Sequence, residues 1–431
     1  MKTENGKLKK YKLGEICDLN LSSLKSSDRI DEILYLDTSN ITENRIADLQ
    51  SFSIANAPSR AQRKVRNNTI IFSTVRPNQN HFGIIKNPQS NLIVSSGFTT
   101  LDIKNPEDFD ANYVYLKLTQ PYVVNYLQTL AQNSVSAYPS INPDDIGNLS
   151  FYFPPLESQQ KIAAVLSTLD DKIALNRRMN AKLEQMAKRL YDHWFVQFDF
   201  PFDFACFDSA QQSTRSQSVA ERSRGYKSSG GKMEYNEVLK REIPAGWEVK
   251  KLSDFAKYVD NTDSADMIVN YISTDNMLPN KAGISDSISK PLKGNFVRYE
   301  KFDVLISNIR PYFKKIWFSN LVGNCSTDVL CIRSNSESDS FFIYRTLWQD
   351  DFFDYVMQGA KGSKMPRGDK TRIMDFSVAY PSDNTDVLKK FNSFFEPLQK
   401  SIWKNESETQ KLTALRDRLL PLLMNGQVEV K

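Results

Sequence analysis

The chain of 431 residues is poor in the side chains that many enzymes use for acid–base chemistry and metal binding. It has only two histidines, His81 and His193, and they lie in distant parts of the sequence. A histidine-based catalytic centre or metal cluster is therefore not expected. The four cysteines form no Cys-x-x-Cys pair, which argues against a zinc site. So few thiols fit a reducing compartment, and we expect a cytoplasmic protein.

Long apolar runs are missing as well. No stretch approaches the ~20 consecutive apolar residues that a membrane-spanning helix requires. The basic segment 1–14 lacks the apolar core of a signal peptide. We therefore expect no association with a membrane.

Signatures of nucleotide binding and methyl transfer are also absent. The segment GYKSSGGK at 225–232 lacks the glycine spacing of a phosphate-binding loop. The segment INPDDI at 141–146 lacks the second proline and the aromatic residue of a methyltransferase motif. The carboxylate pairs Asp144–Asp145 and Asp170–Asp171 lie beside predicted helix starts or on solvated helix faces. The sequence predicts a chain that is not an enzyme and binds no cofactor.

A long internal repeat is the main positive feature. The segment TIIFSTVRP at 69–77 returns as DVLISNIRP at 303–311, and further matches follow at an offset of 229, such as Tyr115 with Tyr344. A period of this size is too long for a solenoid unit, so it indicates a duplicated domain with its helix. Two related but different modules on one chain are suited to two related partners or sites.

Each repeat reads as a mixed α/β block followed by a long helix. Strands are expected at 70–75, 83–86, 91–96 and 99–103, and a helical pattern covers 113–130 with Pro121 near its middle. The fold class is α/β, with two similar globular domains joined by two long antiparallel coiled-coil helices in a pseudo-twofold arrangement. The expected segments are a first domain at 1–153, a helix at 154–200, a linker at 201–234, a second domain at 235–382 and a second helix at 383–431.

The two long helices carry matching heptad seams. Apolar residues alternate with spacings of four and three, and polar residues occupy the middle of each seam. If the helices pair with each other, Asn176 approaches Asn405 and fixes the register; alternatively, each helix only fills the core of its own domain. Pro397 and Pro421 should bend or delimit the second helix. The predicted pairing residues are Leu169, Ile173, Asn176, Leu183, Leu398, Ile402, Asn405 and Leu412.

Three segments resemble the specificity subunit of type I restriction–modification systems. They are PSINPDDIGNLSFYFPPLESQQKIAAVLSTLDDKIALNRR at 139–178, DHWFVQFDFPF at 192–202 and YKSSGGKMEYNEVLKREIPAGWEVKKLSD at 226–254. With the repeat, the resemblance spans nearly the whole chain. Two departures are visible: the first repeat begins with KLKKYKLGEI instead of an IPAGW-like segment, and residues 205–224 are longer and more polar than the family's connector.

The resemblance implies a non-catalytic chain whose two target-recognition domains each read half of a split double-stranded DNA sequence. Two modification subunits would carry S-adenosylmethionine, and restriction subunits would use ATP and magnesium. A helix of roughly 58 Å spans at most ~17 base pairs, so we expect a bipartite asymmetric target with an unread gap of several base pairs. The alternatives are a protein-binding scaffold, a restriction–methylation enzyme acting alone, and the specificity chain of a related restriction type.

Basic and small polar residues in turn-rich segments are the DNA-contact candidates, against the alternative of solvated loops and structural salt bridges. The net charge of +5 permits such a partner. Arginine suits guanine edges and phosphates, and glycine allows close approach to a phosphate. The candidates are Arg60, Arg63, Lys64 and Arg66 in segment 59–68; Arg76 and Arg310 in the two Arg–Pro pairs; Gln132, Asn133 and Ser134 in segment 131–145; and Lys361, Ser363, Lys364, Arg367 and Lys370 in segment 358–370.

Overall fold

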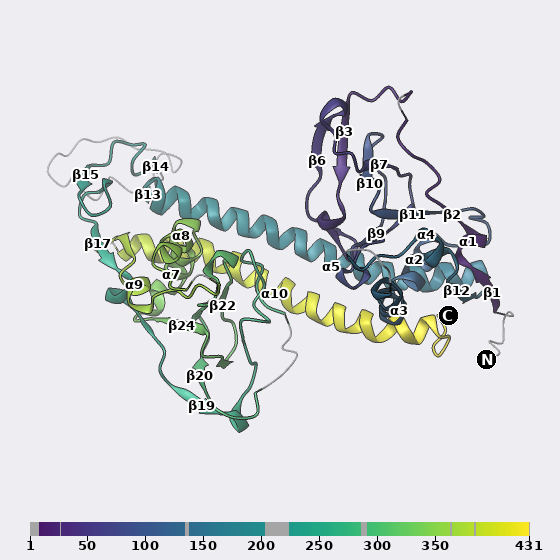
Figure 1. Cartoon of the computed structure of the whole chain (residues 1–431). Helices are drawn as coiled ribbons and strands as arrows, with labels where there is room; N and C mark the ends of the chain where they lie inside the picture. Colours follow the sequence, from purple (N-terminus) through teal and green to yellow (C-terminus); the bar gives the residue numbers. More distant parts are fainter. Residues whose placement is uncertain are drawn as a thin grey trace, which may run out of the picture. The chain divides into compact units, whose positions relative to one another are not determined.

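The computed structural model describes residues 8–25, 27–133, 138–202, 224–285, 291–362, 364–382 and 385–430. The chain divides into two compact units. Unit 1 consists of residues 1–175 with 408–431, and unit 2 consists of residues 176–407. Two long helices, α5 (Leu156–Tyr191) and α10 (Thr385–Met424), contribute residues to both units (Figure 1).

Unit 1 contains two four-stranded sheets. The first has the order β2 (Cys17–Leu19), β11 (Phe98–Ile103), β8 (Ile70–Ser73), β9 (Phe82–Ile84), and all its pairings are antiparallel. The second has the order β6 (Gln50–Ser53), β3 (Glu32–Leu36), β10 (Leu92–Ser95), β7 (Ala61–Lys64), with β10 parallel to β3. The four expected strands are confirmed. Strand β8 is buried along its whole length, which explains its continuous apolar sequence.

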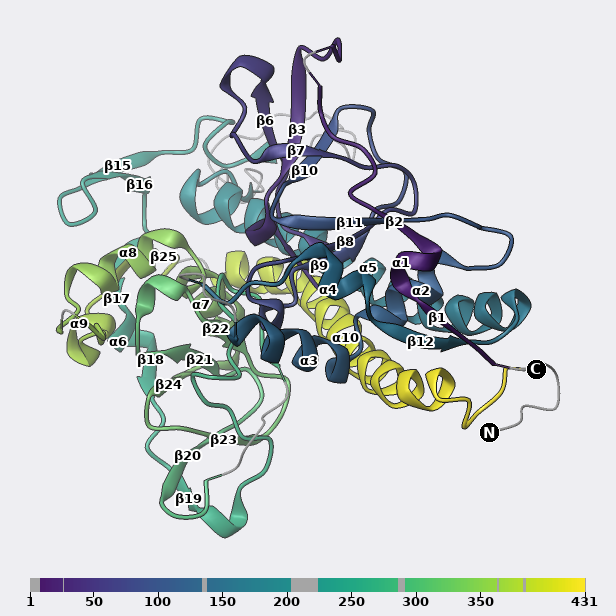
Figure 2. The same cartoon turned by 45° about the vertical axis from the view of Figure 1, so that its right-hand side comes forward.

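Short elements complete unit 1. Two small antiparallel pairs join β1 (Lys9–Lys12) to β12 (Ser150–Phe153) (Figure 2), and β4 (Ile41–Thr42) to β5 (Arg45–Ile46). The helices are α1 (Leu13–Ile16), α2 (Ala111–Leu118), α3 (Pro121–Gln132) and α4 (Pro143–Gly147). The helical pattern expected at 113–130 forms two helices, because α2 ends before Pro121 and α3 begins at it. Pro121 is the first residue of α3. A backbone N–H at that position has no acceptor within the helix, so proline, which lacks an N–H, loses no hydrogen bond there.

Unit 2 repeats the first sheet. The strand order is β18 (Ala256–Tyr258), β24 (Val329–Ser334), β21 (Val304–Ser307), β22 (Ile316–Phe318), again antiparallel throughout. A three-stranded sheet has the order β19 (Thr262–Ser264), β20 (Asn295–Tyr299), β23 (Gly323–Cys325). The matching strand order means that the repeat in sequence is also a repeat in topology.

The other elements of unit 2 are short. Antiparallel pairs join β13 (Pro201–Phe202) to β14 (Arg224–Gly225), β15 (Met233–Asn236) to β16 (Arg241–Pro244), and β17 (Glu248–Lys251) to β25 (Ser377–Tyr380). The helices are α6 (Leu252–Phe255), α7 (Ser340–Leu347), α8 (Asp350–Gln358) and α9 (Lys370–Met374). Aromatic side chains from α5, α7 and α10 form much of the core.

Helix α10 continues through Pro397 and Pro421, so of the two expected effects, bending or delimiting the helix, these prolines do not delimit it. Proline removes one backbone hydrogen bond from a helix interior. Tertiary packing compensates, because Phe395 is fully buried before the first proline and Leu423 and Met424 are buried after the second. Within the described ranges, none of the helices is long and apolar enough to cross a membrane.

Helices α5 and α10 contact each other inside each unit, and there they run in opposite directions. In unit 1, Arg416 Nη1 lies 3.1 Å from Asp170 Oδ1, and Lys172 Nζ lies 3.4 Å from Glu408 Oε2. In unit 2, Asn405 Nδ2 donates to Asn180 Oδ1 over 2.8 Å. Asn180, one turn beyond the predicted Asn176, is therefore the side-chain partner of Asn405.

The predicted pairing residues vary in burial. Ile173, Asn176, Ile402 and Asn405 are buried, whereas Leu169, Leu183, Leu398 and Leu412 are half-buried. The buried asparagines stand near the middle of each helix. A buried polar pair favours one helix register over its neighbours, because a shift would leave an amide without a partner.

Candidate nucleic-acid interface

The two Arg–Pro pairs form the same unusual turn in both units. Arg76 and Arg310 have left-handed backbone conformations, with φ of 48° and 52°. A buried proline then opens a short 3-10 helix, η3 (Pro77–Gln79) in unit 1 and η8 (Pro311–Phe313) in unit 2. A second left-handed residue, Asn80 or Lys314, closes each turn. Left-handed conformations are uncommon for residues other than glycine and are concentrated at functional sites.

Backbone hydrogen bonds place each turn beside a second candidate segment. Arg76 N–H donates to the Pro139 carbonyl over 2.9 Å, and Arg310 N–H donates to the Pro366 carbonyl over 2.7 Å. Isolated bridges pair Val75 with Ser140 and Ile309 with Arg367. The structure thus brings Arg76 next to the segment after α3, and Arg310 next to the basic segment 358–370.

A two-residue turn braces each Arg–Pro turn from the other side. In unit 1, Glu43 N–H donates to the Asn80 carbonyl and Asn44 N–H to the Phe82 carbonyl, both over 2.8 Å. In unit 2, Asn280 N–H donates to the Phe313 carbonyl over 2.8 Å, and Lys281 N–H donates to the Lys314 carbonyl over 2.9 Å. All four donors have positive φ, as in the type I′ turns of hairpins.

In unit 1, the surface around the turn is polar with little charge. Arg76 is exposed, and its guanidinium carbon lies 5.1 Å from the centroid of the Tyr138 ring. Gln132 and Asn133 are exposed at the end of α3, and the predicted Ser134 lies outside the described residues. Amide side chains of this kind donate and accept hydrogen bonds, as contact with base edges requires.

In unit 2, the corresponding surface is basic. Residues 361 and 367 exchange backbone hydrogen bonds and so form an isolated antiparallel bridge. Lys361 Nζ pairs with Asp369 over 3.0 Å, and Arg367 pairs with Asp328 over 3.1 Å. Lys364 and Lys370 are exposed, and neither forms an ion pair with any described residue. The predicted Ser363 lies outside the described residues.

The predicted basic residues of segment 59–68 mostly have structural partners. Lys64 Nζ lies 2.6 Å from Asp28 Oδ2, and Arg66 Nε lies 2.9 Å from Asp102 Oδ1. Arg63 donates to the Ser23 hydroxyl over 3.2 Å. Arg60 is exposed at the edge of the sheet that contains β10. The structure does not tie Arg63, Lys64 or Arg66 to the Arg76 turn.

The sheet that recurs in the two units contains an ion pair with a buried carboxylate in each unit, but the carboxylate stands at a different position in each. Neither ion pair was predicted from the sequence. In unit 1, the buried carboxylate is Asp102 on β11, and it accepts from Thr69 Oγ1 over 2.6 Å and from exposed Arg66. In unit 2, the carboxylate is Asp303 before β21, and Arg333 on β24 pairs with it. Strand pairing places Asp303 where Thr69 stands and Arg333 where Asp102 stands. Alignment of the two repeats shows this exchange, because Thr69 aligns with Asp303 and Asp102 aligns with Arg333.

A buried charge cluster connects α5 to α7 in unit 2. Arg345 is fully buried, its Nη1 lies 2.6 Å from Glu184 Oε2, and its guanidinium lies 4.2 Å from the Trp348 ring centroid. Burial and the nearby Glu184 carboxylate raise the pKa of Glu406 on α10 to about 7. In the described parts of the chain, no three His, Cys, Asp or Glu side chains are arranged to hold a metal ion.

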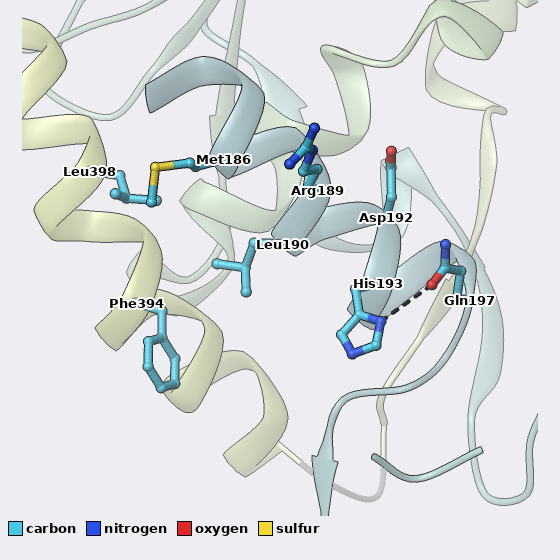
Figure 3. A pocket seen from close by; sticks show the side chains of 8 residues that line it. All are labelled: Met186, Arg189, Leu190, Asp192, His193, Gln197, Phe394 and Leu398. Carbon is cyan, nitrogen blue, oxygen red and sulfur yellow. Dashed lines mark hydrogen bonds between the residues drawn. The ribbon is translucent and has the colours of Figure 1, made fainter. Parts of the chain in front are cut away.

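An apolar hollow of about 670 Å³ lies between α5 and α10 in unit 2. Figure 3 shows Met186 and Leu190 of α5 facing Leu398 and Phe394 of α10, with polar side chains at one end. His193 Nδ1 and Gln197 Oε1 are 3.2 Å apart at that end. Met186 and Phe394 are 54% and 57% exposed, so the hollow presents apolar surface to solvent.

Comparison with known proteins agrees with this architecture. Residues 5–185 match the family model for the type I restriction modification DNA specificity domain. The chain is 24% identical over 472 residues to the type I restriction enzyme HindI specificity subunit of Haemophilus influenzae, covering 97% of this chain and 99% of that one. It is 25% identical over 377 residues to the type I restriction enzyme MjaIX specificity subunit of Methanocaldococcus jannaschii, covering 84% and 78%.

A solved structure has the same fold. The crystal structure of the type I restriction-modification system S subunit from M. genitalium aligns with a TM-score of 0.55 at 14% identity, and the alignment covers 98% of this chain and 97% of that chain. By its domain match and its two relatives, the chain is similar to the specificity subunits of type I restriction–modification systems.

Proposed function

We propose that the chain reads a split double-stranded DNA target, with one half-site contacted by each unit through the surface around its Arg–Pro turn. The observation that carries this proposal is a braced turn repeated in both units with different neighbours. Unit 1 surrounds Arg76 with amides, whereas unit 2 surrounds Arg310 with lysine and arginine. A common scaffold with divergent contact residues is what two different half-sites need.

We propose that α5 and α10 form an antiparallel coiled-coil spacer that sets the gap between the half-sites. Helix α5 has 36 residues. At ~1.5 Å per residue that is ~54 Å, the length of ~16 base pairs at ~3.4 Å each. Half-sites about one helical turn apart lie on one face of the duplex, so an unread gap of several base pairs fits this length.

The apolar hollow of unit 2 supports a role in docking a helical segment of a modification subunit. The internal repeat places Val165, Leu169, Leu415 and Leu419 of unit 1 at positions matching its four apolar side chains. Two equivalent surfaces would dock two modification subunits. In this proposal the chain itself does no chemistry, and S-adenosylmethionine, ATP and magnesium are bound by the modification and restriction subunits.

The docking surfaces can be tested one at a time. Met186→Asp should remove one modification subunit from the purified complex, and Leu415→Asp, the matched change in unit 1, should remove the other. The double variant should bind none. Mass determination by light scattering distinguishes the three compositions, and a full complement in the double variant would contradict the docking proposal.

DNA contact is tested by salt dependence. Replacing a phosphate-contacting lysine should weaken binding and reduce the slope of log affinity against log salt by about 1. We expect this for Lys364→Ala, measured by fluorescence anisotropy on the complex with its modification subunits. The matched control is Lys389→Ala, because Lys389 is an exposed lysine of the same unit but lies on α10, far along the chain from the turn. Equal slopes for both variants and the wild type would exclude Lys364.

Methylation mapping tests the function as a whole. Single-molecule sequencing of genomic DNA with the gene present and deleted should show loss of one split adenine-methylated motif. A protein-binding scaffold would leave the methylation pattern unchanged and would show no salt-sensitive affinity for DNA.

A further inference from the structure

Two exposed aromatic rings stand at the tip of the Arg–Pro turn in unit 2, where unit 1 has two amides. Tyr312 is 46% exposed and Phe313 is 38% exposed, and their ring centroids are 4.6 Å apart. The matching residues in unit 1 are Asn78 and Gln79. Neighbouring aromatic rings left in solvent indicate a contact surface, and here only one of two otherwise equivalent turns has it.

The backbone that carries these rings is held from both ends. Phe313 N–H donates to the Arg310 carbonyl over 2.9 Å, and the Phe313 carbonyl accepts from Asn280 N–H over 2.8 Å. The left-handed residues Arg310 and Lys314 flank the pair. A rigid turn loses little conformational entropy when its side chains are immobilised by a partner.

A salt-bridge brace adds to this rigidity. Asp350, the first residue of α8, lies 2.6 Å from Lys314 Nζ and 2.8 Å from Lys281 Nζ. These two ammonium groups lower the pKa of Asp350 to about 2, so it is charged at any physiological pH. Lys281 Nζ also lies 4.1 Å from the ring centroid of Trp348. The Asp350 carboxylate therefore ties both the Arg–Pro turn and the two-residue turn at Asn280 and Lys281 to α8.

The charges around the rings favour a nucleic acid over an apolar protein surface. Lys315 Nζ lies 5.8 Å from the centroid of the Phe313 ring. Arg310 is joined by its backbone to the basic segment 358–370, in which Lys364 is exposed. Apolar side chains presented among basic groups are the kind that enter a base step and partly unstack it, because the surrounding cations hold the phosphates.

We propose that Tyr312 and Phe313 form an apolar wedge that enters a base step in the half-site read by unit 2 and unstacks it. This inference depends on the DNA-reading function proposed above. Unit 1 has no such wedge, because its turn presents the amides of Asn78 and Gln79. The two half-sites are then read by different physical means: unit 1 by hydrogen bonds to base edges, and unit 2 in part by the deformability of one step.

The test uses the full chain in complex with its modification subunits and a duplex carrying both half-sites. 2-Aminopurine, whose fluorescence rises when it is unstacked, replaces each adenine of the two half-sites in turn, except the adenines that the modification subunits methylate, because a methyltransferase extrudes its target base from the stack. We expect a several-fold rise in one half-site only. The variant Y312S/F313S should abolish this rise while the salt slope of binding stays that of the wild type. The control variant Tyr235→Ser, which removes an exposed aromatic ring of unit 2 on β15, should keep it. Circular dichroism checks that both variants are folded, as expected for exposed positions.

The outcomes separate the wedge from the proposed function. Salt-sensitive binding without any fluorescence rise overturns the wedge and leaves the DNA-reading function standing. A rise that persists in Y312S/F313S overturns the wedge as well. If the wild-type complex shows no salt-sensitive binding to the duplex, the proposed function fails and the wedge fails with it.

Discussion

Removal of Arg333 should destabilise unit 2 far more than removal of Arg66 destabilises unit 1, although each arginine pairs with the buried carboxylate of the main sheet in its own unit. The Asp303 side chain is 1% exposed and accepts two hydrogen bonds from Arg333, over 2.8 and 2.7 Å. Arg333→Ala leaves that carboxylate buried without its counter-ion, which costs about 3–5 kcal/mol.

Removal of Arg66 should reduce the stability of unit 1 only slightly. The Arg66 side chain is 59% exposed and makes one hydrogen bond to Asp102, which keeps the hydroxyl of Thr69 as a donor. Arg66→Ala should therefore cost about 1 kcal/mol. A third variant, D303N/R333M, removes both charges and keeps an acceptor oxygen for the Glu300 N–H that now donates to Asp303 over 2.7 Å. It should recover most of the loss.

Native-state hydrogen exchange can read each unit separately, which a global melting curve of a two-unit chain cannot. Each ~1.4 kcal/mol of lost stability changes the unfolding equilibrium constant tenfold. Arg333→Ala should therefore lower the protection against hydrogen exchange of peptides from β21 and β24 by at least ~100-fold. Peptides from β8 and β11 serve as the internal control. The reasoning is refuted if Arg333→Ala costs no more than Arg66→Ala, or if D303N/R333M is as unstable as Arg333→Ala.

Three further predictions concern the long helices. Because burial and Glu184 raise the pKa of Glu406 to about 7, its contribution to the stability of unit 2 is present below the unfolded pKa of ~4.3 and is lost as pH rises through 7. Glu406→Gln should raise the melting temperature by an amount that grows from pH 5 to pH 8, and a pH-independent gain would contradict this assignment. Asn405→Leu should destabilise the helix pair by about 1–2 kcal/mol, because Asn180 Oδ1 loses its donor, whereas the double change N180L/N405L should be no less stable than the wild type in urea unfolding. Deleting one heptad from either helix should shorten the unread gap in the methylated motif, and an unchanged gap would rule out the spacer.

The sequence predicted the repeat, the strands of the main sheet and the presence of two long helices, because those features depend on local apolar patterns. It also predicted that the two Arg–Pro pairs are equivalent. Their left-handed arginines could not be foreseen, because that conformation is imposed by bonds to Pro139 and Pro366, far along the chain. Pro397 does not end helix α10, because burial of the neighbouring aromatic side chains outweighs the local preference of proline.

The candidate site was predicted only in outline. Basic residues were chosen by type, but Lys64 and Arg66 turn out to neutralise Asp28 and Asp102, a pairing that needs the tertiary fold. The exposed Tyr312 and Phe313 were overlooked, since aromatic residues are usually assigned to a core. Their position directly after an Arg–Pro pair, where the other repeat has two amides, was the available signal.

The composition of unit 1 has a consequence for the synthesis of the chain. Its core is completed by Leu423 and Met424, and the buried Lys117 donates to the Met424 carbonyl over 2.6 Å. A ribosome must therefore translate all of unit 2 before the first-made unit can finish folding. Until then the apolar side chains of Ile162 and Ala163, which pack into the same core, remain exposed to water and to chaperones. A premature stop codon near position 408 would consequently damage unit 1, most of which is encoded upstream of it, while leaving every residue of unit 2 in place.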